Sequence, residues 1–180
     1  MVKLENKLSI KRNKIGILGG SFDPAHKGHL IISKEAKKRF NLKKIIWAIT
    51  QKNPLKKSSL VKLKNRINFC KKVIGRNNFI KVKFYEKIIG SNKTIDLINH
   101  VLKNNNCEIY FIMGADNLIN FHKWYKWKSI SKICNILVFD RQGFKAKSLK
   151  SISFKRLNRK HITFIQFKKI NISSSQLRKI

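Results

Sequence analysis

Short apolar runs alternate along the chain with longer stretches in which apolar residues recur every three or four positions. Runs of the first kind predict β-strands, and stretches of the second kind predict helices. The expected strands are Lys14–Leu18, Lys44–Ile49, Phe79–Tyr85, Glu108–Met113, Asn135–Phe139 and His161–Phe167. The expected helices are Leu30–Phe40, Ser59–Ile74, Thr94–Lys103 and Lys126–Ile133.

Two of the strand runs indicate how the strands pack. IIWAI (45–49) and IYFIM (109–113) are apolar at consecutive positions, as in strands that are covered on both faces. Such strands, separated by helices, predict an α/β fold with a single doubly wound, mostly parallel sheet. Residues 1–13 are expected to form a basic N-terminal extension to a domain of residues 14–180. Residues 141–160 lack periodicity and are expected to form a long loop or a small excursion.

The composition fits one soluble domain with an unusual charge. The 180 residues, 42% of them hydrophobic, suffice for a substantial core and exclude a disordered tail. Against 42 Lys and Arg stand only 8 Asp and Glu, a formal net charge of +34. One interpretation is compositional drift towards lysine; the other is a field that attracts anions such as nucleotides, nucleic acid or acidic lipid. The lysines are spread along the whole chain, which argues against a protein built for nucleic acid.

The three cysteines point to a reducing compartment. Cys70, Cys107 and Cys134 are odd in number and far apart, which favours buried thiols over disulfides or a zinc site. No stretch is apolar for long enough to be a signal peptide or a membrane span. The chain is therefore expected to be soluble and cytoplasmic.

The segment GGSFDPAHKGHL (19–30) joins the first expected strand to the first expected helix. Ligands bind at the carboxyl ends of parallel strands, and Gly19 and Gly20 allow a close approach to the backbone. His26 and His29 flank the start of the helix, where unpaired N–H groups attract anions and imidazoles can donate to phosphate. No Cys or carboxylate completes a metal-ligand pattern with the two histidines. The segment therefore predicts a phosphate site.

GGSFDPAHKGHL closely resembles the signature of the nucleotidyltransferase superfamily with an H-x-G-H motif. Later segments resemble those of one branch, the bacterial nicotinate-nucleotide adenylyltransferases. These segments are QKNPLK (51–56), KTIDL (93–97), GADNL (114–118), FHKWYKW (121–127), DRQGF (140–144) and ISSSQLR (172–178). Gln142 stands where this family usually has proline, and Leu97 where it has threonine. The resemblance covers residues 14–178 and implies a Rossmann-like nucleotidyltransferase fold.

The resemblance also implies a set of site residues. Catalytic contacts with phosphates are implied for His26, His29 and Arg178. Contacts with ATP are implied for Gly19, Gly20, Ser21, Phe22, Asp23, Gly114, Asp116, Ser174 and Ser175. Contacts with the mononucleotide are implied for Lys56, Thr94, Trp124 and Tyr125.

Several of these residues also have a purely structural interpretation. Asp23 fits a turn or a cap, Thr94 and Ser174 fit helix caps, and Trp124 fits a core. Asp116 favours function, because a carboxylate after a buried strand suits ribose hydroxyls.

The implied reaction joins ATP and nicotinate mononucleotide into nicotinate adenine dinucleotide and releases pyrophosphate, as a step of NAD biosynthesis. Mg²⁺ is expected to be held mainly by the ATP phosphates and water, with no dedicated protein metal site. Alternative acceptors are nicotinamide mononucleotide and phosphopantetheine; a basic nucleic-acid-binding protein is an alternative of another class. The chain is not expected to bind a membrane, and it is expected to bind nucleic acid at most non-specifically. A homo-oligomer is possible.

Overall fold

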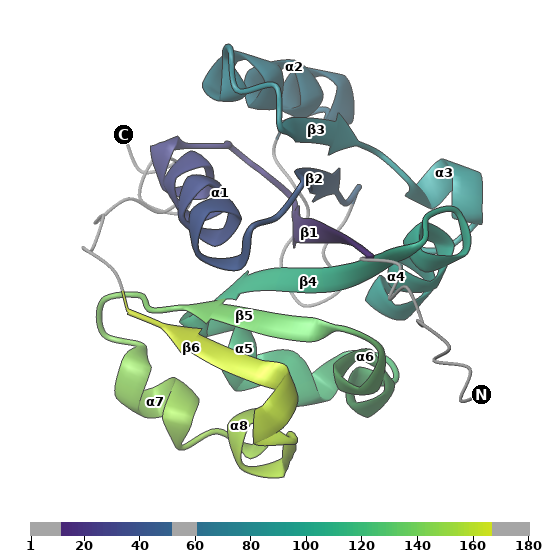
Figure 1. Ribbon diagram of the computed structural model, residues 1–180. Coiled ribbons are helices and arrows are strands. Elements are labelled where there is room, and N and C mark those ends of the chain that lie inside the picture. The colour runs from purple at the N-terminus through teal and green to yellow at the C-terminus, as the bar shows by residue number, and fades with distance from the viewer. Residues whose placement is uncertain (1–11, 52–60, 167–180) are drawn as a thin grey trace, which may run out of the picture.

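The computed structural model describes residues 12–51 and 61–166 of the chain. Six strands of these residues form one sheet, with helices on both of its faces (Figure 1). The strands are β1 (Asn13–Gly20), β2 (Lys44–Ile49), β3 (Ile80–Lys83), β4 (Cys107–Gly114), β5 (Asn135–Phe139) and β6 (Ile162–Ile165). The helices are α1 (Lys27–Phe40), α2 (Leu63–Ile74), α3 (Glu86–Ile89), α4 (Thr94–Lys103), α5 (Ala115–Asn120), α6 (Trp127–Ile133), α7 (Lys145–Leu149) and α8 (Ile152–Arg156), with 3₁₀ turns η1 (Phe121–Lys123) and η2 (Arg159–His161).

The strand order is β3-β2-β1-β4-β5-β6, and every neighbouring pair is parallel. This is the doubly wound order, in which the direction of winding reverses between β1 and β4. The predicted fold class is confirmed. Because of this reversal, the chain leaves β1 and β4 at the same edge of the sheet but runs to opposite faces, with α1 on one face and α5 on the other.

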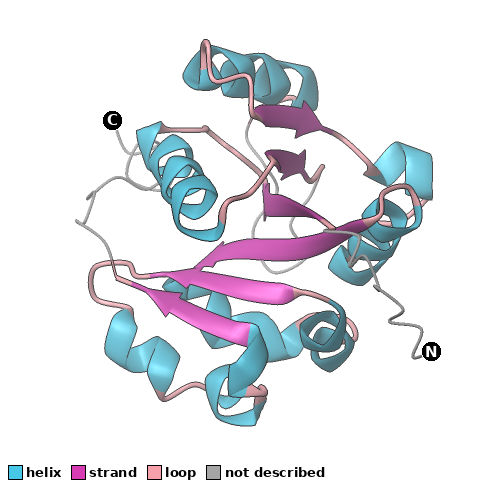
Figure 2. Cartoon of the chain, in the orientation of Figure 1, coloured by secondary structure: helices cyan, strands magenta, loops and turns pink. Residues whose placement is uncertain are grey.

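Figure 2 shows helices on both faces of the sheet, and each face carries its own apolar cluster. On one face, Ala36 of α1 and Cys70 of α2 pack with Trp47 of β2. On the other, Ile98 of α4 packs with Phe111 of β4. Burial on both faces explains why the central strands are apolar at consecutive positions.

The structure differs from the sequence-based expectation mainly after β5. Of the two alternatives for residues 141–160, the long loop is wrong and the small excursion is right, since the segment contains α7, α8 and η2. Ser151 caps α8 by accepting from the N–H of Phe154 (3.2 Å), and Ser148 and Ser153 are fully buried. Short helices that bury serines instead of large apolar residues carry no apolar periodicity.

Smaller differences lie at element ends. Helix α1 begins at Lys27, three residues before the expected Leu30, because His26 caps it. Strand β3 ends at Lys83, two residues earlier than expected. The three cysteines are free and buried, as predicted. Within the described ranges, no helix has the length and apolar character that crossing a membrane requires.

Candidate active site

The described segments of the predicted site meet at the carboxyl edge of the sheet. Gly19 and Gly20 end β1, and Gly114 ends the neighbouring β4. A short segment joins β1 to α1, whereas β4 leads directly into α5. This edge, at the reversal of the winding, is where doubly wound sheets bind ligands.

The two histidines form a reciprocal cap on the start of α1. Nδ1 of His26 accepts from the N–H of Gly28 (3.1 Å), and Nδ1 of His29 accepts from the N–H of His26 (3.2 Å). This is the geometry of a capping box, built here from two imidazoles whose ring centroids are 3.9 Å apart. Because each Nδ1 accepts, each neutral ring carries its hydrogen on Nε2. The cap therefore fixes which nitrogen can donate to a phosphate oxygen.

His26 is neutral at physiological pH. Burial, and secondly the positive charge of Arg141, lower the pKa of His26 from 6.5 to about 4. Because of the lowered pKa, this ring offers a hydrogen-bond donor without carrying a positive charge. Arg141, which follows β5, is therefore close enough to the β1–α1 segment for its charge to act on His26.

Packing holds the β1–α1 segment in an unusual backbone conformation. Phe22 has a φ of 47°, which bulky residues rarely adopt. Its ring is 2% exposed and stacks on Trp47, with centroids 5.0 Å apart. Nε1 of Trp47 donates to Ser33 (2.9 Å), which donates to the carbonyl of His29 (2.8 Å). The segment is thus fixed to β2 before any ligand is present.

Asp23 and the two strand-end glycines give mixed results. Asp23 does not cap α1, because His26 does, and it is only 2% exposed, so little of it is open to a ligand. A Cβ on Gly19 or Gly20 would make ordinary contacts, 3.5 Å from Phe111 and 3.6 Å from Phe22. The protein's own packing therefore does not require glycine there, and the close approach of a ligand stays a prediction.

The segment after β4 brings a carboxylate and a guanidinium together. Nη1 of Arg141 donates to Oδ2 of Asp116 at 2.5 Å, with side chains 37% and 19% exposed. The other carboxylate oxygen lies over Gly114, where any Cβ would collide with it. A side chain at 114 would therefore displace the Asp116 carboxylate from this position.

Three of the predicted mononucleotide contacts, Thr94, Trp124 and Tyr125, lie in segments that follow β3 and β4. Trp124 is partly buried, edge-on to Phe111 and Phe121 at centroid distances of 5.9 and 5.2 Å. Tyr125 is 54% exposed, with the ammonium of Lys93 6.0 Å from its ring centroid. The structure thus brings Tyr125 beside the start of α4, where Thr94 lies.

Thr94 itself is not a helix cap. It is the first residue of α4, and Lys93 is the N-cap. Ser91 accepts from the N–H of Lys93 (3.1 Å) and donates to Asp96 (2.6 Å), which turns the chain into the helix. The capping interpretation of Thr94 is therefore wrong, and its contact with a mononucleotide stays a prediction.

Four of the predicted site residues, Lys56, Ser174, Ser175 and Arg178, lie outside the described residues.

Two arginines of the described structure were missing from the predicted site. Arg141 lies in DRQGF, a segment that the resemblance singled out, and its place directly after a strand was a usable signal. Arg66 is a buried residue of α2 that donates to the carbonyl of Ser21 at 2.6 Å. Nothing in the sequence separates Arg66 from the many other basic residues on helices.

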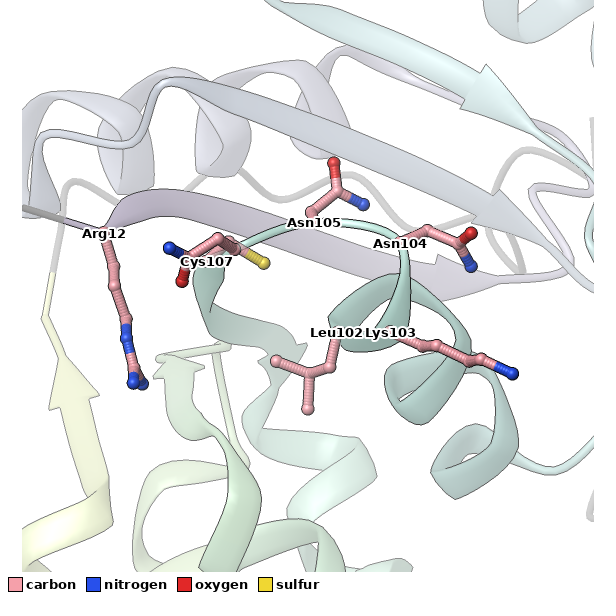
Figure 3. Close-up of a pocket in the computed structure, with 7 residues that line it drawn as sticks. Arg12, Leu102, Lys103, Asn104, Asn105 and Cys107 are labelled. Atoms are coloured by element: carbon pink, nitrogen blue, oxygen red, sulfur yellow. The ribbon is translucent and has the colours of Figure 1, made fainter. Parts of the chain in front are cut away.

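An open hollow of about 560 Å³ lies at the opposite edge of the sheet (Figure 3). It is lined by Arg12, Leu102, Lys103, Asn104, Asn105, Asn106 and Cys107. Cys107 begins β4, so this hollow is at the amino ends of the strands. None of the predicted site residues lines it.

The carboxylates of the described site do not form a metal cage. Within residues 12–51 and 61–166, no three His, Cys, Asp or Glu side chains gather as a set of metal ligands. Asp116 is already paired with Arg141.

Comparisons with known proteins agree on one family. Residues 17–180 match the family model described as cytidylyltransferase-like. The probable nicotinate-nucleotide adenylyltransferase of Pelagibacter ubique is 71% identical to this chain over the whole of both proteins. The probable nicotinate-nucleotide adenylyltransferase of Agrobacterium fabrum is 40% identical over 72% of this chain and 70% of that protein.

A solved structure shows the same fold at low sequence identity. It is the nicotinic acid mononucleotide adenylyltransferase of Plasmodium falciparum complexed with NaAD, with a TM-score of 0.75 and 24% identity over 93% of this chain and 83% of that one. Together with the 71% identical relative, the family match leaves no ambiguity about descent: the chain belongs to the cytidylyltransferase-like family, among the nicotinate-nucleotide adenylyltransferases.

Proposed function

We propose that this chain transfers the adenylyl group of ATP to nicotinate mononucleotide, which gives nicotinate adenine dinucleotide and pyrophosphate in NAD biosynthesis. The observation that carries this proposal is the 71% identity to a nicotinate-nucleotide adenylyltransferase over the full length of both chains. The geometry supports it, because the described segments predicted to bind ATP meet at the carboxyl edge of the sheet.

The reaction needs alignment more than it needs a base. A phosphate monoester has a second pKa of about 6, so the mononucleotide phosphate is largely dianionic at neutral pH. One of its oxygens attacks the α-phosphorus of ATP, the bond from that phosphorus to the bridging oxygen breaks, and pyrophosphate leaves with that oxygen. The protein's task is to hold the two phosphates in line and to stabilise the charge that develops.

The capped start of α1 is suited to that task. Neutral His26 presents a donor on Nε2, and the reciprocal cap orients it before ATP binds. We assign the phosphate contacts to His26, His29 and the backbone of residues 19–23, with Arg178 as a further contact. Preorganised donors of this kind need no rearrangement in the transition state.

The junction of β4 and α5, which carries Asp116, is suited to the nucleoside. Arg141 holds Asp116 with part of its surface exposed, and we assign its carboxylate to ribose hydroxyls. We assign Trp124 to the pyridine ring, and Tyr125, Thr94 and Lys56 to the remainder of the mononucleotide.

Mg²⁺ fits this site as a companion of ATP. Its oxygen ligands would come mainly from the phosphates and water, as Mg²⁺ prefers. The ion would neutralise phosphate charge. The proposed compartment is the cytoplasm, which the three free, buried cysteines fit.

Pyrophosphate release tests the proposal. The purified chain is given ATP and Mg²⁺ with nicotinate mononucleotide, nicotinamide mononucleotide or phosphopantetheine at equal concentration. The expected result is release with the nicotinate compound at a rate well above the other two. Equal rates with the acid and the amide would overturn the assignment of the acceptor, and no release with any acceptor would overturn the activity.

A further inference from the structure

Arg66 of α2 is a buried cation that has no role in the mechanism proposed above. It is 3% exposed, and neither ion pair of the described residues includes it. Four backbone carbonyls surround its guanidinium. Nη1 donates to Ser21 (2.6 Å) and Thr50 (2.8 Å), Nη2 to Gln51 (3.1 Å) and Nε to Val61 (3.0 Å). A planar fork of donors can satisfy several carbonyls at once, which offsets the cost of burying the charge.

The carbonyls belong to segments that are far apart in sequence. Ser21 belongs to the β1–α1 segment, which we call the phosphate loop because it is predicted to bind phosphate. Thr50 and Gln51 follow β2. One nitrogen, Nη1, holds both Ser21 and Thr50. Arg66 therefore ties the β1–α1 segment to the end of the neighbouring strand.

The bond to Ser21 has a directional consequence. The Ser21–Phe22 peptide is trans, so its C=O and N–H point in opposite directions. With the Ser21 carbonyl turned towards Arg66, the N–H of Phe22 points away from the guanidinium. Phe22 has a φ of 47° and its ring is clamped on Trp47, so the peptide is held from both sides in one orientation.

Glu86 of α3 provides a natural comparison. Its carboxylate accepts from the hydroxyl of Thr50 and from the N–H of Gln51 (3.2 Å). Glu86 thus holds the same end of β2 as Arg66 does. The bond to Ser21 comes from Arg66, so the two residues differ in their connection to the phosphate loop.

We propose that Arg66 is a positioning residue for the phosphate loop: it orients the Ser21–Phe22 peptide so that the Phe22 N–H donates to the phosphate chain of the nucleotide. The proposal rests on the proposed function for its kinetic consequence only. Binding of a phosphate chain can be measured without turnover.

The test compares Arg66→Lys with Glu86→Gln, using inorganic tripolyphosphate as the probe. Lysine keeps the charge but lacks the fork, so it cannot hold Ser21 and the Thr50–Gln51 turn together. We expect Arg66→Lys to weaken tripolyphosphate binding about 10-fold or more, since a bond to a charged group is lost, and to lower kcat by about 10- to 100-fold, as small misplacements do. Glu86→Gln should lower the thermal midpoint while its tripolyphosphate affinity stays within about threefold of the wild type.

Two results would overturn the proposal. One is an Arg66→Lys protein with a lowered midpoint and unchanged tripolyphosphate affinity; the other is an equal loss of affinity in Glu86→Gln. If Arg66→Lys does not fold, the amide of Phe22 in the wild-type protein decides: tripolyphosphate must slow its hydrogen exchange, and unchanged exchange contradicts the role. Failure of the proposed function would appear separately, as a wild type that binds tripolyphosphate but releases no pyrophosphate.

Discussion

The turns after β1 and after β4 lie at the same edge of the sheet but are stabilised in different ways. After β1, the contacts go to the backbone: imidazoles accept from N–H groups and Arg66 donates to the carbonyl of Ser21. After β4, the contact joins two side chains, Asp116 and Arg141, at 2.5 Å. The first turn is sealed by the buried ring of Phe22, and the second leaves its charged groups partly exposed.

The difference indicates a division of labour between phosphate and sugar. A turn whose peptides are fixed by buried contacts can present N–H groups in a set geometry, which suits phosphate oxygens. A turn that ends in a carboxylate suits hydroxyl groups, which donate hydrogen bonds. We therefore expect changes in the first turn to affect the chemical step, and changes in and after the second turn to affect recognition of one substrate.

The largest effect is expected from His29→Ala in the first turn. Loss of one preorganised donor to developing charge should lower kcat/KM by about 10²–10³. The variant loses one of the two bonds of the reciprocal cap, and loss of a cap costs at most about 0.5–2 kcal/mol of stability, so the protein should still fold. Steady-state kinetics with circular dichroism measure both, and His100→Ala on α4 serves as a control histidine. A folded variant with full activity would show that His29 has no catalytic role.

A smaller and selective effect is expected from Trp124→Ala, beyond the second turn. Stacking of a base on an aromatic ring contributes about 1–3 kcal/mol, so KM for nicotinate mononucleotide should rise about 5- to 150-fold. KM for ATP should change little. The thermal midpoint should also fall, because Trp124 packs edge-on against Phe111 and Phe121.

Trp127→Ala is the matched control, since Trp127 also packs against Phe121, at 6.0 Å between centroids. It should lower the midpoint without raising either KM. If Trp124→Ala and Trp127→Ala behave alike, Trp124 is a packing residue and the pyridine pocket lies elsewhere.

The smallest effect concerns the pH dependence of stability. The pKa of His26 is about 4 in the folded chain and about 6.5 when unfolded. Between these values the unfolded state binds more protons, so His26 makes stability fall as pH drops from about 6.5 towards 4. His26→Asn keeps a capping side chain and should lose less stability between pH 7 and pH 5 than the wild type, measured by urea unfolding. An equal loss in both proteins would contradict the lowered pKa.

The sheet was predictable because its signal is local. Consecutive apolar residues identified β2, β4 and β5 almost to the residue, since strands buried on both faces leave little choice of side chain. After β5, a small excursion was one of two expectations, but its helices were not predicted, because Ser148 and Ser153 fill positions that usually hold apolar residues. Burial of serines that bond to the backbone follows from tertiary packing, which leaves no periodic trace.

For the candidate site, a motif predicts which residues take part, but not the contacts that the fold makes between residues far apart in sequence. His26 and His29 were proposed from H-x-G-H, and their mutual capping was not expected. Arg141 meets Asp116 across 25 positions of sequence, and Arg66 meets Ser21 across 45. Such pairs depend on the order of the strands in the sheet, and no local stretch of sequence reveals that order.

The division of labour between the two turns is tested most directly by calorimetric binding of two ligands to Asp116→Asn. Inorganic tripolyphosphate carries the phosphate chain of ATP without its ribose or base. We expect Asp116→Asn to weaken the binding of ATP about 10- to 150-fold, which is the range for the loss of a hydrogen bond to a charged group. Tripolyphosphate should bind as tightly as to the wild type, or tighter, because Arg141 is released. Equal weakening of both ligands would contradict the assignment of the second turn to the sugar and of the first to the phosphates.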